Sequence, residues 1–415
     1  MELYYSFSIL IVLASIFAYI NLRYLKLPST IGIMLIAITV SIFARIAGES
    51  LFPEMTKDLH NLISGIDFTE ILMGGMLNFL LFAGAIHVQF SDLKEQKIPV
   101  LIFSTFSVIL STFVIGGIFY YLAPLFSIEL PFVYCLLFGA LISPTDPIAV
   151  LGILKKANVS KSLETKITGE SLFNDGVAVV LFVVIFQMTQ TPDMEVNLGK
   201  ISLLLAKEVL GGLALGLALG YSASRAMKVI DDYIVSVLIT LSVVMGGYLI
   251  ASFFHISGPL AMVAAGLFIG NYGKKTAMSK LTKEYLSKFW ELIDEVLNAI
   301  LFLFIGLELL IIENFESYWG ISTIAIVVVL FARTVSIVLP ATIVPFKPKL
   351  SKGTLKMLVW GGLRGGVSIA LVLTVNDPQY KELLLEMTYF VVVFSIFVQG
   401  LTVGKVSQKV LKDEK

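Results

Sequence analysis

Long apolar segments separated by short polar loops recur along the whole chain. Each is about as long as a helix that crosses a bilayer, which needs roughly 17 to 25 apolar residues. We therefore expect an all-α polytopic membrane protein. The pattern predicts thirteen transmembrane helices, at 4–22, 29–44, 64–86, 99–122, 131–153, 164–188, 201–222, 232–252, 257–271, 289–311, 320–344, 354–374 and 385–404.

Lysine and arginine are distributed unevenly between the two sides of this predicted bundle. If successive loops lie on opposite sides of the membrane, 23 of the 30 basic residues fall on one side and 4 on the other. The remaining three lie within helices. Because basic loops stay in the cytoplasm, we expect the N-terminus outside and the C-terminus inside. The first segment has neither a basic leader nor a small-residue cleavage site, so we expect it to be retained.

The order of the segments suggests a single membrane domain, 1–415, made of two halves in opposite orientation. Six helices over 1–188, a linker helix at 201–222 and six more over 232–404 give the layout of an inverted-repeat transporter. A short cytoplasmic tail, 405–415, follows.

The fifth helix of each predicted half is interrupted. The first contains "SPTDP" at 143–147, and the second contains "WGGLRGGVSIA" at 360–370. Proline breaks the helical hydrogen bonds, and opened backbone is tolerated in a membrane only where protein or water satisfies it. Interruptions at corresponding positions of two repeats indicate a substrate site near the midplane.

Composition narrows the functional classes. Hydrophobic residues make up 57% of the chain and charged residues 14%, with a mean hydropathy of +0.91, whereas soluble domains have roughly 25% charged residues. The formal net charge is zero, so no overall field attracts nucleic acid. With one cysteine, Cys135, and three scattered histidines, disulfides and a structural metal site are not expected. No Walker motif is present, and we expect neither an enzyme nor a cofactor.

Ionisable residues inside the apolar segments are candidates for function, because each costs roughly 2.5 to 3.5 kcal/mol to insert. Other acids, such as Glu291, Asp294, Glu295 and Glu308, are expected near the ends of their helix. The informative ones are Asp146, Glu170, Asp175, Arg333 and Arg364.

Asp175 is the strongest candidate for an ion ligand. It lies in "GESLFNDGVAVV", where Ser171 is one helical turn earlier and Asn174 is adjacent. Hard cations such as sodium prefer oxygen ligands, and an opened backbone at Thr145 and Asp146 can add carbonyls. Three acids against two arginines leave one net negative charge, which one sodium ion or one proton can neutralise. The sequence thus predicts competition at Asp175 and one-for-one exchange driven by an ion gradient.

Each of these residues also has a purely structural interpretation. Asp146 can cap a broken helix, and Glu170 can be a structural acid paired with Arg333. Arg364 can compensate the dipoles of half-helices or act directly as a gate. Asp175 can be a satisfied core carboxylate. The glycine-rich stretch at 211–220 indicates close helix packing, either within the chain or with a second protomer.

These motifs resemble the sodium/proton antiporters of the NhaP and sodium/hydrogen exchanger group, in the monovalent cation/proton antiporter superfamily. "SPTDPIAV", "GESLFNDGVAVV", "FWELIDEVLNAILFLFIGLEL", "FAR" and "GGLRGGVSIAL" occur in the family's order, and the likeness runs from about residue 5 to residue 405. The resemblance implies an NhaA-like antiporter fold, a homodimer, and unwound helices 5 and 12 that cross in a core domain moving as an elevator.

The resemblance also implies residue roles. Asp175 would be the ion and proton ligand, with Asn174 beside it. Thr145 through its carbonyl, Asp146 through water, and Ser171 would complete the site. The pair Glu170 and Arg333 and the arginine of unwound helix 12, Arg364, match the family's motifs. An Asn-Asp pair resembles that of the electroneutral exchangers. The short tail favours a prokaryotic inner-membrane protein.

The expected function is electroneutral sodium or lithium/proton antiport for pH and sodium homeostasis. A potassium/proton antiporter of the same fold is the main alternative, because oxygen ligands alone do not distinguish the two ions. A cation channel or a non-transporting membrane sensor would be a different class. A channel would need a continuous selectivity filter, which isolated acids on broken helices do not provide. A sensor would bind the cation without moving it.

Overall fold

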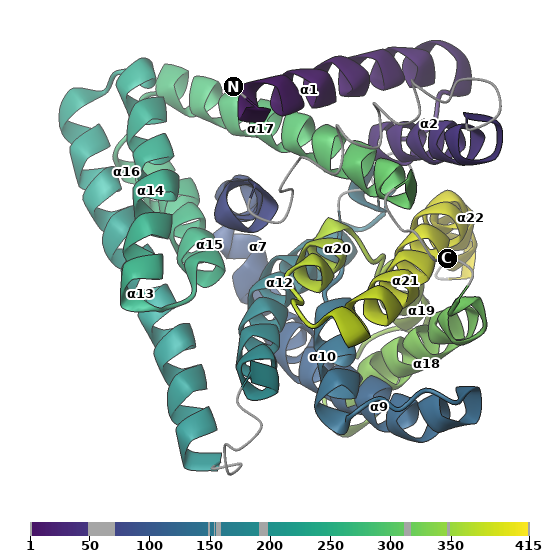
Figure 1. The fold of residues 1–415 in the computed structure, drawn as a ribbon. Helices are drawn as coiled ribbons and strands as arrows, with labels where there is room; N and C mark the ends of the chain where they lie inside the picture. Colours follow the sequence, from purple (N-terminus) through teal and green to yellow (C-terminus); the bar gives the residue numbers. More distant parts are fainter. Residues whose placement is uncertain are drawn as a thin grey trace.

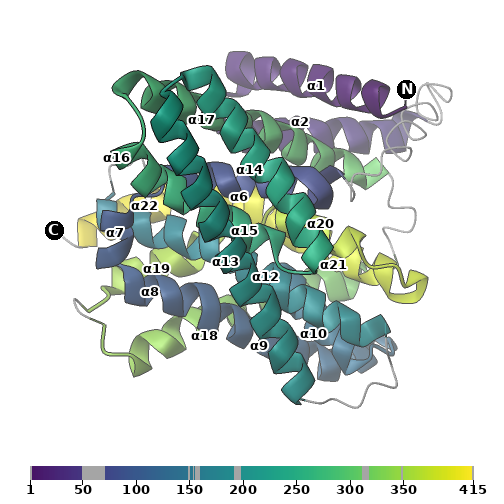
Figure 2. The same ribbon diagram turned by 90° about the vertical axis from the view of Figure 1, so that its left-hand side faces the viewer.

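The computed structural model describes residues 2–48, 71–147, 150–152, 154, 159–190, 198–310, 317–346 and 349–413. In this part of the chain the secondary structure is helical, and the only β-type pairing is an isolated bridge between Asp146 and Leu363. Figures 1 and 2 show that the helices lie in two packed groups.

The first group is built around α17, which packs against α1, α2, α6 and α14, while α15 lies between α6 and α13. Its helices are α1 (Glu2–Ile20), α2 (Ser29–Phe43), α6 (Leu77–His87), α13 (Leu198–Ile230), α14 (Tyr233–Phe254), α15 (Gly258–Phe268), α16 (Lys274–Thr276) and α17 (Lys280–Leu307). The inward-facing hydrophobic side chains of this group pack against one another and are buried.

The second group is built around α10, which packs against α9 and α12, and around α18, which packs against α9 and α21. Its helices are α7 (Phe90–Glu95), α8 (Lys97–Leu101), α9 (Ser107–Leu122), α10 (Phe132–Ile142), α12 (Lys161–Gln190), α18 (Trp319–Ile343), α19 (Lys352–Trp360), α20 (Gly366–Leu373), α21 (Pro378–Phe394) and α22 (Leu401–Asp413). Helix α12 also touches α13 and α15, so it joins the two groups.

Short turns of other helical types extend or connect these helices. The π-helical turns are η1 (Asn21–Leu25), η2 (Ala44–Gly48), η3 (Leu72–Met76), η4 (Ile102–Phe106), η6 (Ile269–Gly273) and η8 (Ser395–Gly400), and the 3₁₀ turns are η5 (Ala123–Phe126) and η7 (Glu308–Leu310). Within the described residues, eight helical stretches are long and apolar enough to cross a membrane. The first residues of the segment predicted at 64–86 lie outside the described residues.

The largest difference from the predicted helices concerns α17. It begins at Lys280, whereas the sequence predicts a start at 289, because the first two turns are charged and do not resemble a membrane segment. Ser279 caps this start by accepting a hydrogen bond from Thr282 N at 3.3 Å. Asp294 consequently lies in the middle of the helix and not near its end, as the sequence had suggested.

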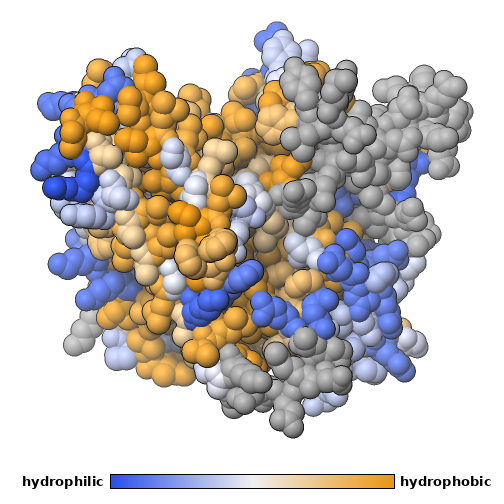
Figure 3. Space-filling view, turned by 60° about the vertical axis from the view of Figure 1, so that its left-hand side comes forward, coloured by the Kyte–Doolittle hydropathy of each residue, from blue (hydrophilic) through white to orange (hydrophobic). Residues whose placement is uncertain are grey.

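The outer face of α13 and α14 is apolar, as Figure 3 shows for the side of the molecule that comes forward there. Its exposed side chains include Leu203, Leu210, Leu217, Leu238 and Leu249. An exposed apolar surface of this extent suits contact with lipid.

The glycines of α13 face the opposite way, toward α15. A Cβ atom at Gly216 would lie 2.2 Å from Ala261 O, and one at Gly212 would lie 2.6 Å from Ser257 O. Only glycine permits this close approach of the two backbones. The partner of the stretch at 211–220 is therefore α15 of the same chain, and these glycines do not indicate contact with a second protomer.

Candidate functional site

Two interrupted helices cross in the second group. Helix α10 ends at Ile142 and α19 ends at Trp360, and in both cases about five residues of non-helical backbone follow. The two opened segments run antiparallel, and Asp146 N donates a hydrogen bond to Leu363 O at 2.8 Å. The bridge provides each segment with part of the hydrogen bonding that the helix lost.

The glycines of the second segment make this crossing possible. A Cβ atom at Gly365 would lie 2.5 Å from Asp146 Oδ2, and one at Gly362 would lie 2.6 Å from Arg333 Nε. Real Cβ atoms do not approach other atoms so closely. The pattern "GGLRGG" thus reflects the tight passage of backbone past two charged side chains.

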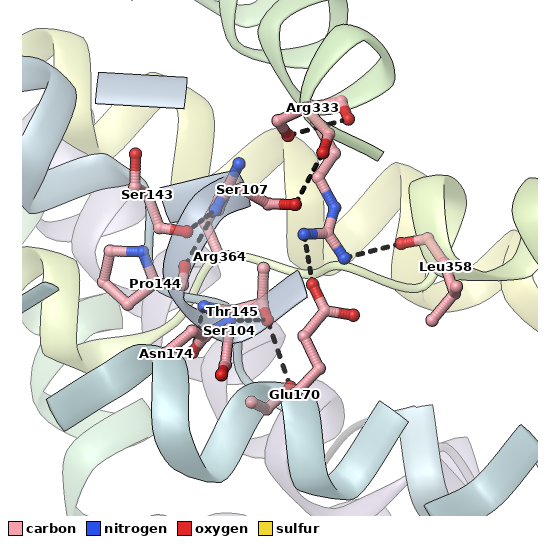
Figure 4. Close-up of polar contacts among 12 residues, drawn as sticks. Ser104, Ser107, Ser143, Pro144, Thr145, Glu170, Asn174, Arg333, Leu358 and Arg364 are labelled. Atoms are coloured by element: carbon pink, nitrogen blue, oxygen red, sulfur yellow. Dashed lines mark hydrogen bonds and ion pairs between the residues drawn. The ribbon is translucent and has the colours of Figure 1, made fainter. Parts of the chain in front are cut away.

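Arg364 satisfies the carbonyls at the opened end of α10 (Figure 4). Its Nη1 donates to Ser143 O, and also to Pro144 O at 3.0 Å. Its own backbone N donates to Ser395 Oγ at 2.8 Å. Arg364 as a whole is 2% exposed. A positive charge at these carbonyls also compensates the negative end of the α10 dipole.

Glu170 and Arg333 form a buried ion pair behind the crossing (Figure 4). Arg333 Nη1 lies 2.5 Å from Glu170 Oε1, and Arg333 Nη2 donates to Leu358 O at 2.7 Å. Both side chains are at most 6% exposed. The pair links α12 to α18 and to the end of α19 that precedes the second break.

Asn174 and Ser171 hold the first opened segment against α12. Asn174 Nδ2 donates to Thr145 Oγ1 at 2.6 Å, and Thr145 N donates to Asn174 Oδ1 at 3.3 Å. The hydroxyls of Thr145 and Ser171 are 3.0 Å apart. Both polar atoms of the Asn174 amide are therefore used within the protein.

A cavity of about 600 Å³ opens between the two groups of helices. Thr145, Asp146, Ser171 and Asp175 all line it. Asp146 and Asp175 are close enough to repel each other. The cavity thus brings together four of the predicted ion-binding residues, two from the opened segment after α10 and two from α12.

The remaining predicted residues lie away from that lining. Asn174 is fully buried next to Thr145. Arg333 and Arg364 instead line a separate, very small hollow, and Glu170 is buried with Arg333. The arrangement places hydroxyl and carboxylate oxygens toward the cavity and both guanidinium groups away from it.

Comparison with known proteins gives this arrangement a family. The model of the sodium/hydrogen exchanger transmembrane family matches residues 11–409. The chain belongs to the sodium/hydrogen exchanger family. It is 45% identical to the Na⁺/H⁺ antiporter NhaP of Pseudomonas aeruginosa, over 96% of this chain and 95% of that protein. It is also 35% identical to the Na⁺/H⁺ antiporter NhaH of Halobacillus dabanensis, over 93% of each.

A solved structure supports the exchanger fold. The sodium proton antiporter MjNhaP1 of Methanocaldococcus jannaschii superposes with a TM-score of 0.79, covering 99% of this chain and 100% of that one, at 20% identity. The family assignment and this likeness agree with a multi-pass membrane transporter, and the family is one of transporters, not enzymes. Among the described residues, no group of three His, Cys, Asp or Glu side chains could hold a metal ion.

The structure brings into the cavity, or buries, polar residues that the sequence pattern had suggested near helix ends or had not singled out. Asp294 and Asn298 of α17 line the same cavity as Asp175. Their sequence signals are their spacing of one helical turn and their place in the motif "FWELIDEVLNAILFLFIGLEL", which also contains Glu291 and Glu295. Glu308 and Glu386 are buried as well, at 3% and 1% exposure. The count of three core acids against two arginines was therefore incomplete.

At the rim of the cavity, an ion pair joins α7 to the start of α12. Lys161 Nζ lies 2.8 Å from Asp92 Oδ2. The hydrogen bond from Lys161 lowers the pKa of Asp92, which lies in the loop helix α7 outside the membrane segments. The positive charge of Lys161 is thereby balanced by a neighbouring carboxylate.

Proposed function

We propose that this protein is a sodium/proton antiporter in which one cation and one proton compete for Asp175. The observation that carries the proposal is the separation of charges at the crossing: Asp146 and Asp175 face the cavity while Arg333 and Arg364 face away from it. This separation leaves carboxylate oxygens accessible to a cation arriving through water. The similar proteins NhaP and NhaH are both named as Na⁺/H⁺ antiporters, which agrees with this proposal.

In this mechanism Asp175 is the shared ligand for sodium and for the proton. Asp146, through water, the carbonyl of Thr145 and the hydroxyl of Ser171 complete the coordination of the cation, because hard cations prefer oxygen ligands. Asn174 contributes by holding Thr145 in place. A buried carboxylate is costly when charged. The states in which Asp175 has bound sodium or a proton are therefore the ones suited to movement across the membrane.

The buried ion pair and Arg364 have supporting roles in this proposal. Glu170 and Arg333 are a structural pair that fixes α12 against α18. Arg364 compensates the opened carbonyls of α10. Because Glu170 and Arg333 neutralise each other and Arg364 is held by backbone carbonyls, we take the charge that moves to be that of the Asp175 site, so that exchange is electroneutral, with one Na⁺ or Li⁺ for one H⁺.

The movement we propose is an elevator motion of the second group of helices against the first. The support is that Asp175, Thr145 and Ser171 all belong to the second group, whereas the other wall of the cavity is provided by α17 and α6 of the first. The complete scheme has thirteen membrane crossings in two inverted repeats, 1–188 and 232–404, around the linker helix 201–222. It also has an external N-terminus, a cytoplasmic tail at 405–415 and a homodimer in a prokaryotic inner membrane, serving pH and sodium homeostasis.

The test is sodium-driven proton movement in proteoliposomes that contain the purified protein, with the membrane voltage held at zero and then at an imposed value. We expect exchange with sodium that does not change with voltage. We expect it to be lost in Asp175→Asn and retained in Glu164→Gln, which removes a carboxylate from the first turn of the same helix.

Other outcomes would replace parts of the proposal. Exchange that follows the voltage would contradict electroneutrality and would mean that a second carboxylate also carries charge. Exchange with potassium but not with sodium would transfer the scheme to the other ion. Cation flux without proton movement would indicate a channel, and cation binding without any flux would indicate a sensor.

A further inference from the structure

Helix α17 presents a second set of oxygen-bearing side chains to the cavity, on the wall formed by the first group of helices. Asp294 and Asn298 are one helical turn apart, and both line the cavity that Asp175 lines from α12. In Figure 1, α17 runs between the α1 and α2 pair and the helices of the second group. The cavity therefore has acidic residues on both walls.

The two side chains are arranged as a unit. Asn298 Nδ2 donates to Asp294 Oδ1 at 3.0 Å and to Asp294 O at 2.8 Å. These bonds orient the Asp294 carboxylate and fix the Asn298 amide. The spacing of four residues places the two side chains on the same face of the helix.

The other end of the Asn298 amide lacks a partner in the described part of the chain. Asn298 is 1% exposed, and its Oδ1 accepts no hydrogen bond there. Buried polar atoms are nearly always satisfied, so an exception needs a specific explanation. A carbonyl-type oxygen beside an oriented carboxylate is the donor set that a hard cation binds.

The surrounding charges favour a cation and disfavour an anion. Glu291 and Glu295 lie on the same helix and also line the cavity, and Asp146 repels Asp294 from the opposite wall. The lysine at the rim, Lys161, is paired with Asp92 at 2.8 Å. Focused negative potential of this kind raises the local concentration of cations.

We propose that Asp294 and Asn298 form a second cation site, which holds a hydrated monovalent cation before it reaches Asp175. One carboxylate and one amide oxygen, with water as the remaining ligands, suit brief capture of a singly charged ion. Calcium needs six to eight oxygen ligands, often including several carboxylates. The inference rests on the proposed function in one respect, because it takes the cation to be the one exchanged at Asp175.

The position of the site makes its effect one-sided. α17 packs against α1, α2, α6 and α14 of the first group, whereas α12 packs most extensively against α10 of the second group and less against α15 and α13 of the first. If the second group moves and the first does not, Asp294 stays behind when the cation leaves with Asp175. The second site therefore assists loading from the side to which the cavity opens and has no part in loading from the other side.

The first test compares the sodium KM on the two faces of the membrane in everted and right-side-out vesicles. We expect Asp294→Asn to raise the KM on the cavity side by roughly tenfold, as for the loss of one close charge contact, with kcat and the KM on the other side unchanged. Asn298→Leu should raise the cavity-side KM less. Glu295→Gln is the matched control, which removes the same charge from the same cavity wall without touching Asn298.

Two transport results would overturn the proposal. If Glu295→Gln raises the cavity-side KM as much as Asp294→Asn does, the effect is that of a diffuse field and not of a site. If Asp294→Asn raises the KM equally on both faces, or leaves it unchanged, Asp294 takes no part in loading from one side.

The second test uses thallium(I) as a probe in crystals of the Asp175→Asn protein, which does not need to transport. We expect an anomalous peak beside Asp294 and Asn298 that disappears in Asp175→Asn/Asp294→Asn. A folded protein with no such peak overturns the site. Failure of the proposed function would instead appear as absent sodium-driven proton movement in the unchanged protein, so the two failures are distinguishable.

Discussion

Charged side chains have different environments on the two sides of the helix crossing. On one side, Glu170, Arg333 and Arg364 are buried and are bonded to one another or to backbone carbonyls. On the other side, Asp146 and Asp175 face a cavity of about 600 Å³. The same pair of opened helices thus separates groups that hold the fold together from groups that can exchange a ligand with water. The difference predicts that substitutions on the two sides affect stability very differently.

The largest loss of stability is expected from Glu170→Gln on the closed side. Removal of one partner from a buried ion pair leaves an uncompensated charge and costs about 3 to 5 kcal/mol. The free energy of unfolding can be measured in detergent by titration with SDS, followed by tryptophan fluorescence. Glu170→Gln/Arg333→Met should recover part of the loss. If the Glu170→Gln protein were stable but could not exchange ions, Glu170 would belong to the transport site and not to a structural ion pair.

A smaller loss is expected from Gly365→Ala, at the boundary between the two sides. The added methyl group would lie 2.5 Å from Asp146 Oδ2, and overpacking of this kind costs about 1 to 3 kcal/mol. Because the added methyl group also displaces Asp146, we expect a large reduction in the exchange rate together with this moderate loss of stability. Gly117→Ala is the control, since no atom outside its chain neighbours and the backbone of its own helix lies within 4 Å of its Cβ position. Equal effects of the two variants would show that the crossing is less tight than the distances indicate.

Ser171→Ala should have a weaker effect on stability. It removes the hydroxyl that lies 3.0 Å from Thr145 Oγ1, and a hydrogen bond of this type contributes about 0.5 to 1.5 kcal/mol. Because Asn174 still holds Thr145, the opened segment should remain in place while the sodium KM rises. The unfolding titration and the proteoliposome assay measure the two effects. A loss as large as that of Glu170→Gln would contradict a supporting role for this hydroxyl.

The smallest effect on stability is expected from Asp175→Asn, although it abolishes exchange. An amide of the same shape removes a partly buried charge that repels Asp146, so stability should be unchanged or slightly higher. The same SDS titration tests this. If Asp175→Asn destabilised the protein as strongly as Glu170→Gln, Asp175 would be a structural carboxylate and the comparison between the two sides would fail.

Much of the architecture was predictable because membrane insertion depends on local sequence. The breaks at 143–147 and 360–370 were identified from proline and glycine, whose effects on a helix are also local. The start of α17 was missed, since its first turns are charged and a hydropathy pattern does not extend a helix into them. The cavity-lining position of Asp294 was missed for the same reason, because it was assigned to the end of a shorter helix.

The sequence by itself determined the all-helical membrane class, the two interruptions, the acids and arginines near them, and the family resemblance. The tertiary structure alone decided that Arg364 meets the carbonyls of Ser143 and Pro144, and that Asn174 faces Thr145. It also decided that α13 packs its glycines on α15, and that α17 and α12 share one cavity. The physical reason is that transfer free energy is a property of each segment. Contacts between distant helices depend instead on packing and on which buried polar groups can satisfy one another.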